Sequence, residues 1–183
     1  MFITPTEALW AIEPYLCKDL NKNIEVLDPC SGLGDITHWL KNNTSSKIVA
    51  NELYICEDTD KLLHIPEYNE DFLDSQASIP CADVIVANVP YNKAAEFILK
   101  GFEHAPIQWH FLRLSFLEGQ DRFEKLFNLG KLSDVYIFTY RVSCPKGVNR
   151  EKTSNSVCYA WYRFDKYYVG EPKLHWLTKS NNK

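Results

Sequence analysis

Three short segments of the sequence carry residue types and spacings that can bind or react with a ligand. The first is VLDPCSGLGDIT, in which Asp28 ends an apolar run and Gly32 and Gly34 follow in a turn before a helical pattern. Glycine in such a turn permits positive φ angles and lets a ligand approach the backbone closely. A dinucleotide site would have a third glycine next to a pyrophosphate, whereas a carboxylate at the turn suits a cationic, amino-bearing ligand. The segment therefore predicts a site for such a ligand, with a purely structural turn as the alternative.

The second segment supplies a carboxylate at the end of the next apolar run. Glu52 follows the glycine turn by about 20 residues, the interval at which an acid after the second strand can accept hydrogen bonds from ribose hydroxyls. Alone, Glu52 would be a solvated strand end. Because ligands of open α/β sheets bind outside the carboxyl ends of the strands, the turn and Glu52 together favour a nucleoside-bearing ligand.

The third segment is Asn88-Val89-Pro90-Tyr91, which ends another apolar run. The side chain of Asn88 and a main-chain carbonyl in the turn can accept the two hydrogens of an exocyclic amino group. Such acceptors raise the nucleophilicity of the nitrogen and hold it in line for attack. Tyr91 offers a flat face on which a flipped base can stack, a contact worth ~1–3 kcal/mol. The alternative is a strand-terminating turn with a half-buried tyrosine.

The composition limits what else the protein can be. The 183 residues include 20 lysines and arginines against 24 acids, a net charge of −4, so any contact with nucleic acid must be local. The six cysteines and five histidines are dispersed without a CxxC pair, so we expect reduced thiols and no metal site. No apolar run reaches the ~18 residues of a membrane span, and the first residues do not resemble a secretory signal. We therefore expect a cytoplasmic protein that does not bind membranes.

Helical and strand patterns alternate along the chain and must position these segments. Strand patterns cover residues 24–28, 47–53, 68–73, 83–87, 109–116, 135–142 and 157–164, and helical patterns cover 6–20, 35–41, 57–64, 93–104 and 119–127. This alternation predicts an α/β fold with a mostly parallel sheet and helices on both faces. The last two strands predict a C-terminal β-hairpin that brings an antiparallel strand to the edge of the sheet. The length predicts one domain, residues 1–183.

The order of these motifs resembles a known family. Thr4-Pro5, the turn from Asp28 to Gly34, Glu52, the EDFL segment and the NVPY segment together resemble class I S-adenosylmethionine-dependent methyltransferases that methylate amino groups. Within that class the chain is most similar to phage and bacterial adenine-N(6) DNA methyltransferases without a separate recognition domain. The resemblance implies a Rossmann-like, seven-stranded sheet, S-adenosylmethionine as the cofactor and DNA as the substrate. For a phage protein it implies the host cytoplasm as the location.

The resemblance also implies roles for the matching residues. The residues expected to bind the cofactor are Thr4, Pro5, Asp28, Gly32, Gly34, Glu52, Asp71 and Phe72. The first five would lie at its methionine end, the glutamate at its ribose, and the last two at its adenine. The residues expected to hold the target amino group, and therefore to be catalytic, are Asn88, Pro90 and Tyr91.

Positive charge is concentrated late in the chain. Residues 141–163 include five basic residues and one acid. The polar loop at 143–156 would overhang the site, where phosphate contacts position a substrate without reading its sequence. The basic loop residues expected to contact nucleic acid are Lys146, Arg150 and Lys152, with a solvated surface loop as the alternative. Arg113 and Arg122 form a second candidate pair.

Two features leave other functions open. Val89 stands where adenine-N(6) DNA enzymes usually have a proline, a form familiar from rRNA adenine dimethyltransferases. An Asn-x-Pro-Tyr turn also fits the amide nitrogen of glutamine. The alternatives are therefore methylation of adenine in RNA or of glutamine in protein and, from a different class, a catalytically silent cofactor-binding scaffold.

Overall fold

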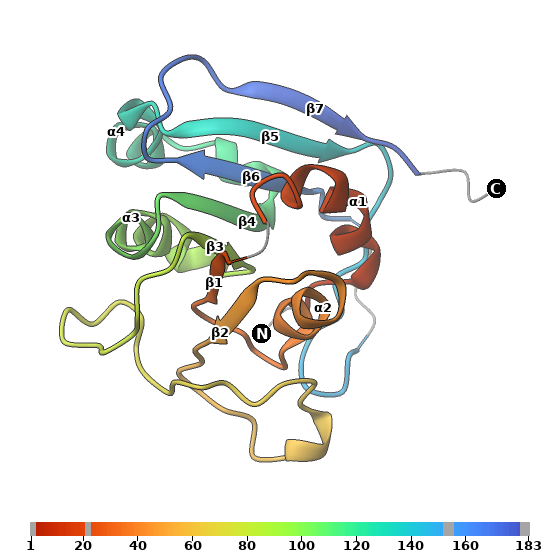
Figure 1. The fold of residues 1–183 in the computed structure, drawn as a ribbon. Coiled ribbons are helices and arrows are strands. Elements are labelled where there is room, and N and C mark those ends of the chain that lie inside the picture. The colour runs from red at the N-terminus through yellow and green to blue at the C-terminus, as the bar shows by residue number, and fades with distance from the viewer. Residues whose placement is uncertain (1–2, 21–22, 152–155, 180–183) are drawn as a thin grey trace.

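The described strands join one seven-stranded sheet that runs through the protein (Figure 1). The computed structural model describes residues 3–20, 23–151 and 156–179. The strands are β1 (Glu25–Asp28), β2 (Lys47–Ala50), β3 (Val84–Ala87), β4 (Ile107–Arg113), β5 (Leu132–Phe138), β6 (Tyr159–Asp165) and β7 (Lys173–Leu177). Their order across the sheet is β2-β1-β3-β4-β6-β5-β7.

Helices cover both faces of this sheet, as the alternating pattern predicts. The α-helices are α1 (Thr6–Leu16), α2 (Asp35–Asn43), α3 (Ala94–His104) and α4 (Gln120–Lys125), and the 3-10 helices are η1 (Thr59–Lys61), η2 (Tyr91–Lys93), η3 (Leu114–Leu117) and η4 (Phe127–Leu129). Helices α1 and α2 share one buried cluster with alternate residues of β1, β3 and β4. Helix α3 shares the other cluster with the intervening residues of those strands. The predicted α/β class is confirmed.

The first half of the sheet is parallel and aligns the strand ends that carry the motifs. Strand β1 pairs in parallel with β2 and β3, and β3 pairs in parallel with β4. All four residues of β3 are buried, as are three of the four in β1 and in β2. Such continuous burial is typical of short parallel strands covered on both faces. As a result, the carboxyl ends of β1 to β4 lie along one edge of the sheet.

The C-terminal half differs in detail from the predicted hairpin. Strands β5 and β6 pair antiparallel, as expected, but β6 also pairs antiparallel with β4 and therefore lies inside the sheet. Strand β6 has the sequence YAWYRFD with five of its seven residues buried, which suits an interior position. The edge is formed instead by β7, parallel to β5. Strand β7 was not predicted, because most of its side chains are exposed and its hydrophobic pattern is weak.

Two expected elements between β2 and β3 are wrong. Residues 68–73 were expected to form a strand, but the structure has only an isolated bridge between Asn51 and Tyr68 there. Residues 57–64 were expected to form a helix, but only η1 is helical. Both segments lie mainly on the surface, where few apolar contacts stabilise a regular element.

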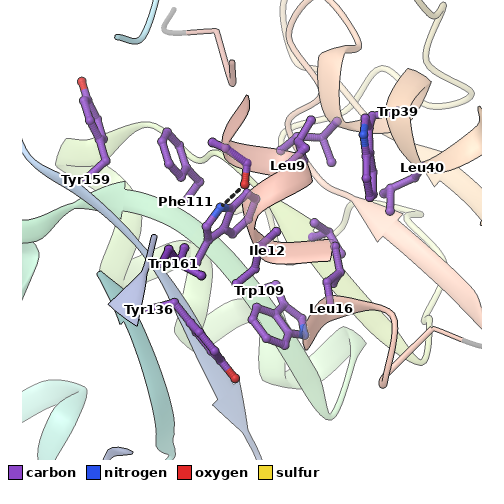
Figure 2. Packing of buried hydrophobic residues seen from close by; sticks show 14 of the residues in the cluster. Leu9, Ile12, Leu16, Trp39, Leu40, Trp109, Phe111, Tyr136, Tyr159 and Trp161 are labelled. Atoms are coloured by element: carbon purple, nitrogen blue, oxygen red, sulfur yellow. Dashed lines mark hydrogen bonds between the residues drawn. The ribbon is translucent and has the colours of Figure 1, made fainter. Parts of the chain in front are cut away.

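The core beneath α1 is aromatic and includes a hydrogen bond to the helix backbone. Figure 2 shows Leu9, Ile12 and Leu16 packed over Trp109 and Trp161. The indole nitrogen of Trp161 donates a hydrogen bond to the carbonyl of Ala8 at 3.0 Å. This bond satisfies a buried donor and helps to fix α1, whose preceding segment reaches the site described below.

No helix among the residues that the structure describes is both long and apolar enough to span a membrane. Over the same residues, no group of three or more histidine, cysteine or acidic side chains is arranged to hold a metal ion.

Candidate functional site

A cavity of about 940 Å³ lies at the carboxyl ends of β1 to β4. Its wall contains most of the residues singled out from the sequence: Thr4, Asp28, Gly32, Glu52, Asn88, Pro90 and Tyr91. These residues come from four separate parts of the chain, which the parallel strands bring together. The spatial clustering of the three motifs is what the argument from strand ends predicts.

The glycine turn adopts the backbone conformation that its sequence requires. Gly32 has a φ of 59° and Gly34 a φ of 86°, in the left-handed region that favours glycine. Gly32 lines the cavity, whereas Gly34 does not. A Cβ atom on Gly34 would lie 2.7 Å from the backbone nitrogen of His64, so this glycine serves close packing between two loops.

Asp28 is the buried carboxylate of the site. Its side chain is 1% exposed, and the Thr37 hydroxyl donates to Oδ2 at 3.0 Å. Oδ1 is also buried, and the Cys30 amide contributes a further hydrogen bond to this carboxylate. Burial raises the pKa of Asp28 to about 7, and the nearby Glu52 and Asp35 carboxylates add to that rise. A cation bound beside this carboxylate would stabilise its charged form.

Glu52 closes the glycine turn from the end of β2. Its Oε2 accepts from the Gly32 amide at 2.7 Å, and its Oε1 accepts from the Tyr54 amide at 3.1 Å. The side chain is partly exposed and lines the cavity. The carboxylate therefore holds both loops that border this part of the cavity.

Asn51 does not line the cavity but joins two loops beside it, a role that was not predicted from the sequence. Its side chain is 1% exposed and bonds to the Pro29 and Glu70 carbonyls at 2.9 and 3.0 Å, while its oxygen accepts from the Glu70 amide at 3.0 Å. The Asn51 carbonyl in turn accepts from the Ser31 amide at 2.9 Å. Asn51 therefore joins the turn to the segment around residue 70. Its only sequence signal is its place immediately before Glu52.

The amide of Asn88 is fixed by the N-terminal segment. Nδ2 donates to the Thr4 hydroxyl at 3.0 Å, and Thr4 is 4% exposed. The donation orients the amide group; Asn88 lines the cavity, and its Oδ1 is buried. Pro5, next to Thr4, is the N-cap residue of α1 and does not line the cavity.

Tyr91 lies half-buried at the other end of the cavity. The Arg113 guanidinium lies 4.8 Å from its ring centroid, and the Tyr159 ring lies 6.1 Å away at 49°. Burial, with a smaller contribution from Tyr159, raises the pKa of the Tyr91 phenol well above its ordinary value. Tyr91 is therefore a neutral aromatic side chain and not an acid or base near neutral pH.

The structure does not bring the two expected adenine-contacting residues into the cavity wall. Phe72 is 2% exposed and stacks on Phe97 at 5.3 Å in the core under α3. Asp71 is exposed, and its Oδ1 accepts from the Leu73 amide at 2.9 Å. The wall near Glu52 is formed instead by residues of the loop after β2, which the sequence analysis did not single out: Tyr54, Cys56, Glu57 and Asp58. Their position directly after Glu52 was the feature of the sequence that could have indicated their place in the cavity wall.

The basic loop lies against the cavity, held by contacts within the chain. Arg150 forms a 2.7 Å salt bridge with Asp35, the first residue of α2, and Lys61 donates to the Asn149 side chain at 2.6 Å. Val148, the residue before Asn149, lines the cavity. The side chain of Lys146 is exposed, and Lys152 lies outside the described residues. The expected contacts of this loop with nucleic acid stay a prediction.

The sequence matches none of the protein-family models or curated proteins with which it was compared. Solved structures do share the fold. They include a type I restriction-modification system methyltransferase subunit from Streptococcus thermophilus, with a TM-score of 0.65 at 15% identity over 92% of this chain and 45% of that one. They also include a SAM-dependent O-methyltransferase from Thermotoga maritima, with a TM-score of 0.58 at 15% identity over 92% and 68% of the two chains.

A dimethyladenosine transferase from Plasmodium falciparum has the same fold, with a TM-score of 0.57 at 15% identity over 90% of this chain and 62% of that one. The chain thus spans less than half of the restriction-modification subunit and less than two thirds of the dimethyladenosine transferase. Its fold is that of class I methyltransferases, as predicted. Since these neighbours act on different atoms and molecules, the choice of substrate must be argued from the site.

Proposed function

We propose that the protein is an S-adenosylmethionine-dependent methyltransferase that acts on the exocyclic amino group of adenine in DNA. The observation that carries this proposal is the position of Asn88. Its amide lies at the wall of a large cavity, oriented by the Thr4 hydroxyl at 3.0 Å, with a neutral aromatic ring from Tyr91 nearby. An oriented amide oxygen and a flat ring are what the capture of an aromatic amine requires.

The residues at the other end of the cavity fit the cofactor. S-adenosylmethionine supplies a methyl group on a positively charged sulfur, from which a nitrogen nucleophile can take it. Asp28, with its buried Oδ1, would bind the cationic amino-acid end together with the backbone of Gly32. Glu52 would accept hydrogen bonds from the ribose hydroxyls. The loop from Tyr54 to Asp58 would border the adenine, a role that the resemblance assigned to Asp71 and Phe72.

Asn88 would act on the target nitrogen. Its Oδ1 would accept a hydrogen bond from the amino group, which withdraws the nitrogen lone pair from the aromatic ring and aims it at the methyl carbon. Positive charge develops on the nitrogen as its bond to that carbon forms, and the acceptor stabilises the hydrogens that carry the charge. The bond between sulfur and the methyl carbon would break as the new bond forms, which leaves the demethylated, neutral cofactor product. The nitrogen would then release one proton to solvent, so the other product is a neutral methylated amine.

DNA is proposed as the substrate because of the motif resemblance, and the fold shared with a restriction-modification subunit supports it. RNA adenine is the second candidate. Val89, which is buried and replaces a proline, favours it, as does the fold shared with a dimethyladenosine transferase. The basic loop with Lys146 and Arg150 is proposed to position the phosphate backbone of either polymer.

The first experiment incubates the purified chain with methyl-labelled S-adenosylmethionine and separate pools of DNA, RNA and protein. We expect label in DNA, and digestion to nucleosides should yield N(6)-methyladenosine in its deoxy form. Label in RNA or in glutamine would support one of the alternatives and overturn DNA as the substrate. Cofactor binding by calorimetry without transfer to any pool would support a silent scaffold.

The second experiment tests Asn88 directly with two variants. Asn88→Ala should lower the single-turnover rate at least ~100-fold, the scale for losing one preorganised contact to the transition state. Asn88→Asp keeps an acceptor and should be affected less. Cofactor affinity should stay near wild type in both, since Asp28 and Glu52 hold the other end of the cavity. A wild-type rate in Asn88→Ala would remove Asn88 from the chemistry.

A further inference from the structure

A second, smaller cavity adjoins the main one on the side of Tyr91. It measures about 280 Å³ and is lined by Tyr91, Asn92, Leu112, Arg113, Ser115, Phe116 and Arg122. Tyr91, Asn92 and Arg113 belong to the walls of both cavities. The two spaces therefore meet at Tyr91, the last residue of the NVPY segment.

The two cavities carry opposite charge. The main cavity is lined by five acidic residues and one basic residue, and the acids are Asp28, Asp35, Glu52, Glu57 and Asp58. The charged residues of the second cavity are both arginines, Arg113 and Arg122, and no acid lines it. A ligand spanning both spaces would thus have a cationic part near the glycine turn and an anionic part beyond Tyr91.

Both guanidinium groups are held in place by the chain. Arg122 donates from Nε to the Phe116 carbonyl at 2.9 Å and from Nη2 to the carbonyls of Ser115 and Glu118. Gly119 makes room for it, because a Cβ atom there would lie 3.1 Å from Nη2 at a φ of +109°. Arg113 is held over the Tyr91 ring at 4.8 Å. Fixed positive charges lose little conformational entropy when an anion binds.

We propose that the second cavity binds a backbone phosphate next to the target base. The inference rests on the proposed function, since it assumes that the base lies on Tyr91. The cavity is below the roughly 300–1,000 Å³ of pockets that bury a whole ligand, which suits a part of a larger molecule. A nucleic acid places a negative charge one sugar away from every base, whereas a glutamine side chain has none beside its amide.

Arg113 and Arg122 would contribute differently to this subsite. Arg113 lies between the cavities and would contact the phosphate while packing on the ring that receives the base. Arg122 would shape the turn at η3 and add its charge to the far wall. Because phosphate contacts carry no sequence information, the subsite would fix the register of the strand and leave base selection to the main cavity.

The test measures binding of a fluorescein-labelled, adenine-containing single-stranded DNA by anisotropy at several salt concentrations, with an RNA of the same sequence in parallel. Arg113→Gln should weaken binding ~10-fold and lower the slope of log K against log salt by about 0.7, the value for one lost phosphate contact on a single strand. Arg113→Lys, which keeps the charge, should retain most of the slope. S-adenosylmethionine affinity should be unchanged in both variants.

Lys47→Gln is the matched control, because it removes one positive charge at the opposite end of the sheet from an exposed side chain. It should leave both the affinity and the salt slope unchanged. An unchanged slope in Arg113→Gln, with a melting temperature like that of the wild type, would overturn the subsite. If Arg113→Gln does not fold, the Arg113→Lys variant and competition of wild-type binding by inorganic phosphate decide the question: no competition overturns the proposal.

The outcomes separate this inference from the proposed function. Methyl transfer that depends on Asn88, together with oligonucleotide binding that is indifferent to Arg113, rejects the subsite alone. Methyl transfer only to the protein pool would reject the phosphate subsite and would also reject DNA as the substrate. It would still agree with methylation of an amino or amide nitrogen. Undetectable cofactor binding rejects the proposed function, and with it the premise of the subsite.

Discussion

Thr4 and Asn88 are 84 residues apart in the chain, yet the hydroxyl of the first accepts a hydrogen bond from the amide of the second at 3.0 Å. Thr4 belongs to the segment before α1, and Asn88 follows β3. The neighbouring Ile3 amide donates to the Pro145 carbonyl at 2.9 Å, so the same segment is also tied to the basic loop. The orientation of the proposed catalytic amide thus depends on the placement of the N-terminal segment.

Replacing Thr4 by valine tests this dependence. Thr4→Val keeps the shape but removes the acceptor, which leaves a partly buried N–H without its bond at a cost of about 1–3 kcal/mol. We expect the single-turnover rate to fall roughly 10-fold as the amide rotates away. Thr4→Ser, which retains the hydroxyl, should restore most of the rate. Equal rates in the valine and serine variants would contradict the positioning role.

The buried Asp28 carboxylate should make cofactor binding depend on pH, since we propose that it binds the cationic end of the cofactor. Burial raises the pKa of this group to about 7, so it is mostly neutral at pH 6 and mostly charged at pH 8. A cationic ligand binds the charged form better. The affinity for S-adenosylmethionine should therefore increase between pH 5.5 and 7, by at most ~10-fold per pH unit, and then level off. Calorimetric titrations in this range should show the change, and Asp28→Asn should flatten it.

The stability of the ligand-free protein should respond in the opposite direction. Because the pKa of Asp28 is raised on folding, the native state holds a proton that the unfolded chain has already lost between about pH 4 and pH 7. This contribution is fully present below that window and is lost as the pH rises through about 7. The melting temperature of Asp28→Asn, relative to that of the wild type, should rise from pH 5 to pH 8. Parallel curves for the two proteins would show that Asp28 titrates normally.

Glu52 contributes both to the turn and to the proposed ribose contact. Glu52→Ala should weaken cofactor binding by ~1–3 kcal/mol, the range for lost hydrogen bonds to a charged group. Glu52→Gln keeps one oxygen that can accept a hydrogen bond from the amide of Gly32 or Tyr54, so this variant isolates the effect of the negative charge. The dissociation constants from calorimetry should rank wild type, Gln and Ala in order of decreasing affinity. A wild-type constant for Glu52→Ala would show that the carboxylate does not touch the cofactor.

We predict that Gly34 is required for close packing against His64 and that it does not contact a ligand. Gly34→Ala adds a Cβ atom 2.7 Å from the His64 backbone at a φ of +86° and should cost about 2–4 kcal/mol of unfolding free energy. The melting temperature should fall by roughly 5–15 °C. Gly130→Ala is the control, because Gly130 has a similar φ of +66° and nothing within 4 Å of its Cβ position. Equal losses in the two variants would rule out the His64 contact as the cause.

The sequence predicted the part of the site that depends on strand ends. Asp28 ends one short, buried strand, and Glu52 and Asn88 follow two others. Parallel strands place such ends together whatever the details of the loops. The positive φ angles of Gly32 and Gly34 could also be predicted, since few residues other than glycine adopt them.

The rest depends on contacts between distant residues, which local patterns do not encode. Phe72 belongs to the core because α3 presents Phe97 to it. Arg150 has Asp35 as its partner, 115 residues away, although its neighbours in sequence suggested an exposed basic loop. Strand β7 has exposed side chains that give no strand pattern, and only its pairing with β5 defines it.

The position of β6 between β4 and β5 affects the order in which the sheet can form during translation. Strand β5 pairs only with β6 and β7 among the described strands, and both are synthesised after it. A nascent β5 therefore has no strand to join until about 20 further residues have left the ribosome, a delay of roughly one to four seconds at usual rates of translation. The cavity residues, by contrast, all precede residue 114 except Val148. The growing polypeptide can thus assemble most of the cavity wall before β5, β6 and β7 complete the sheet.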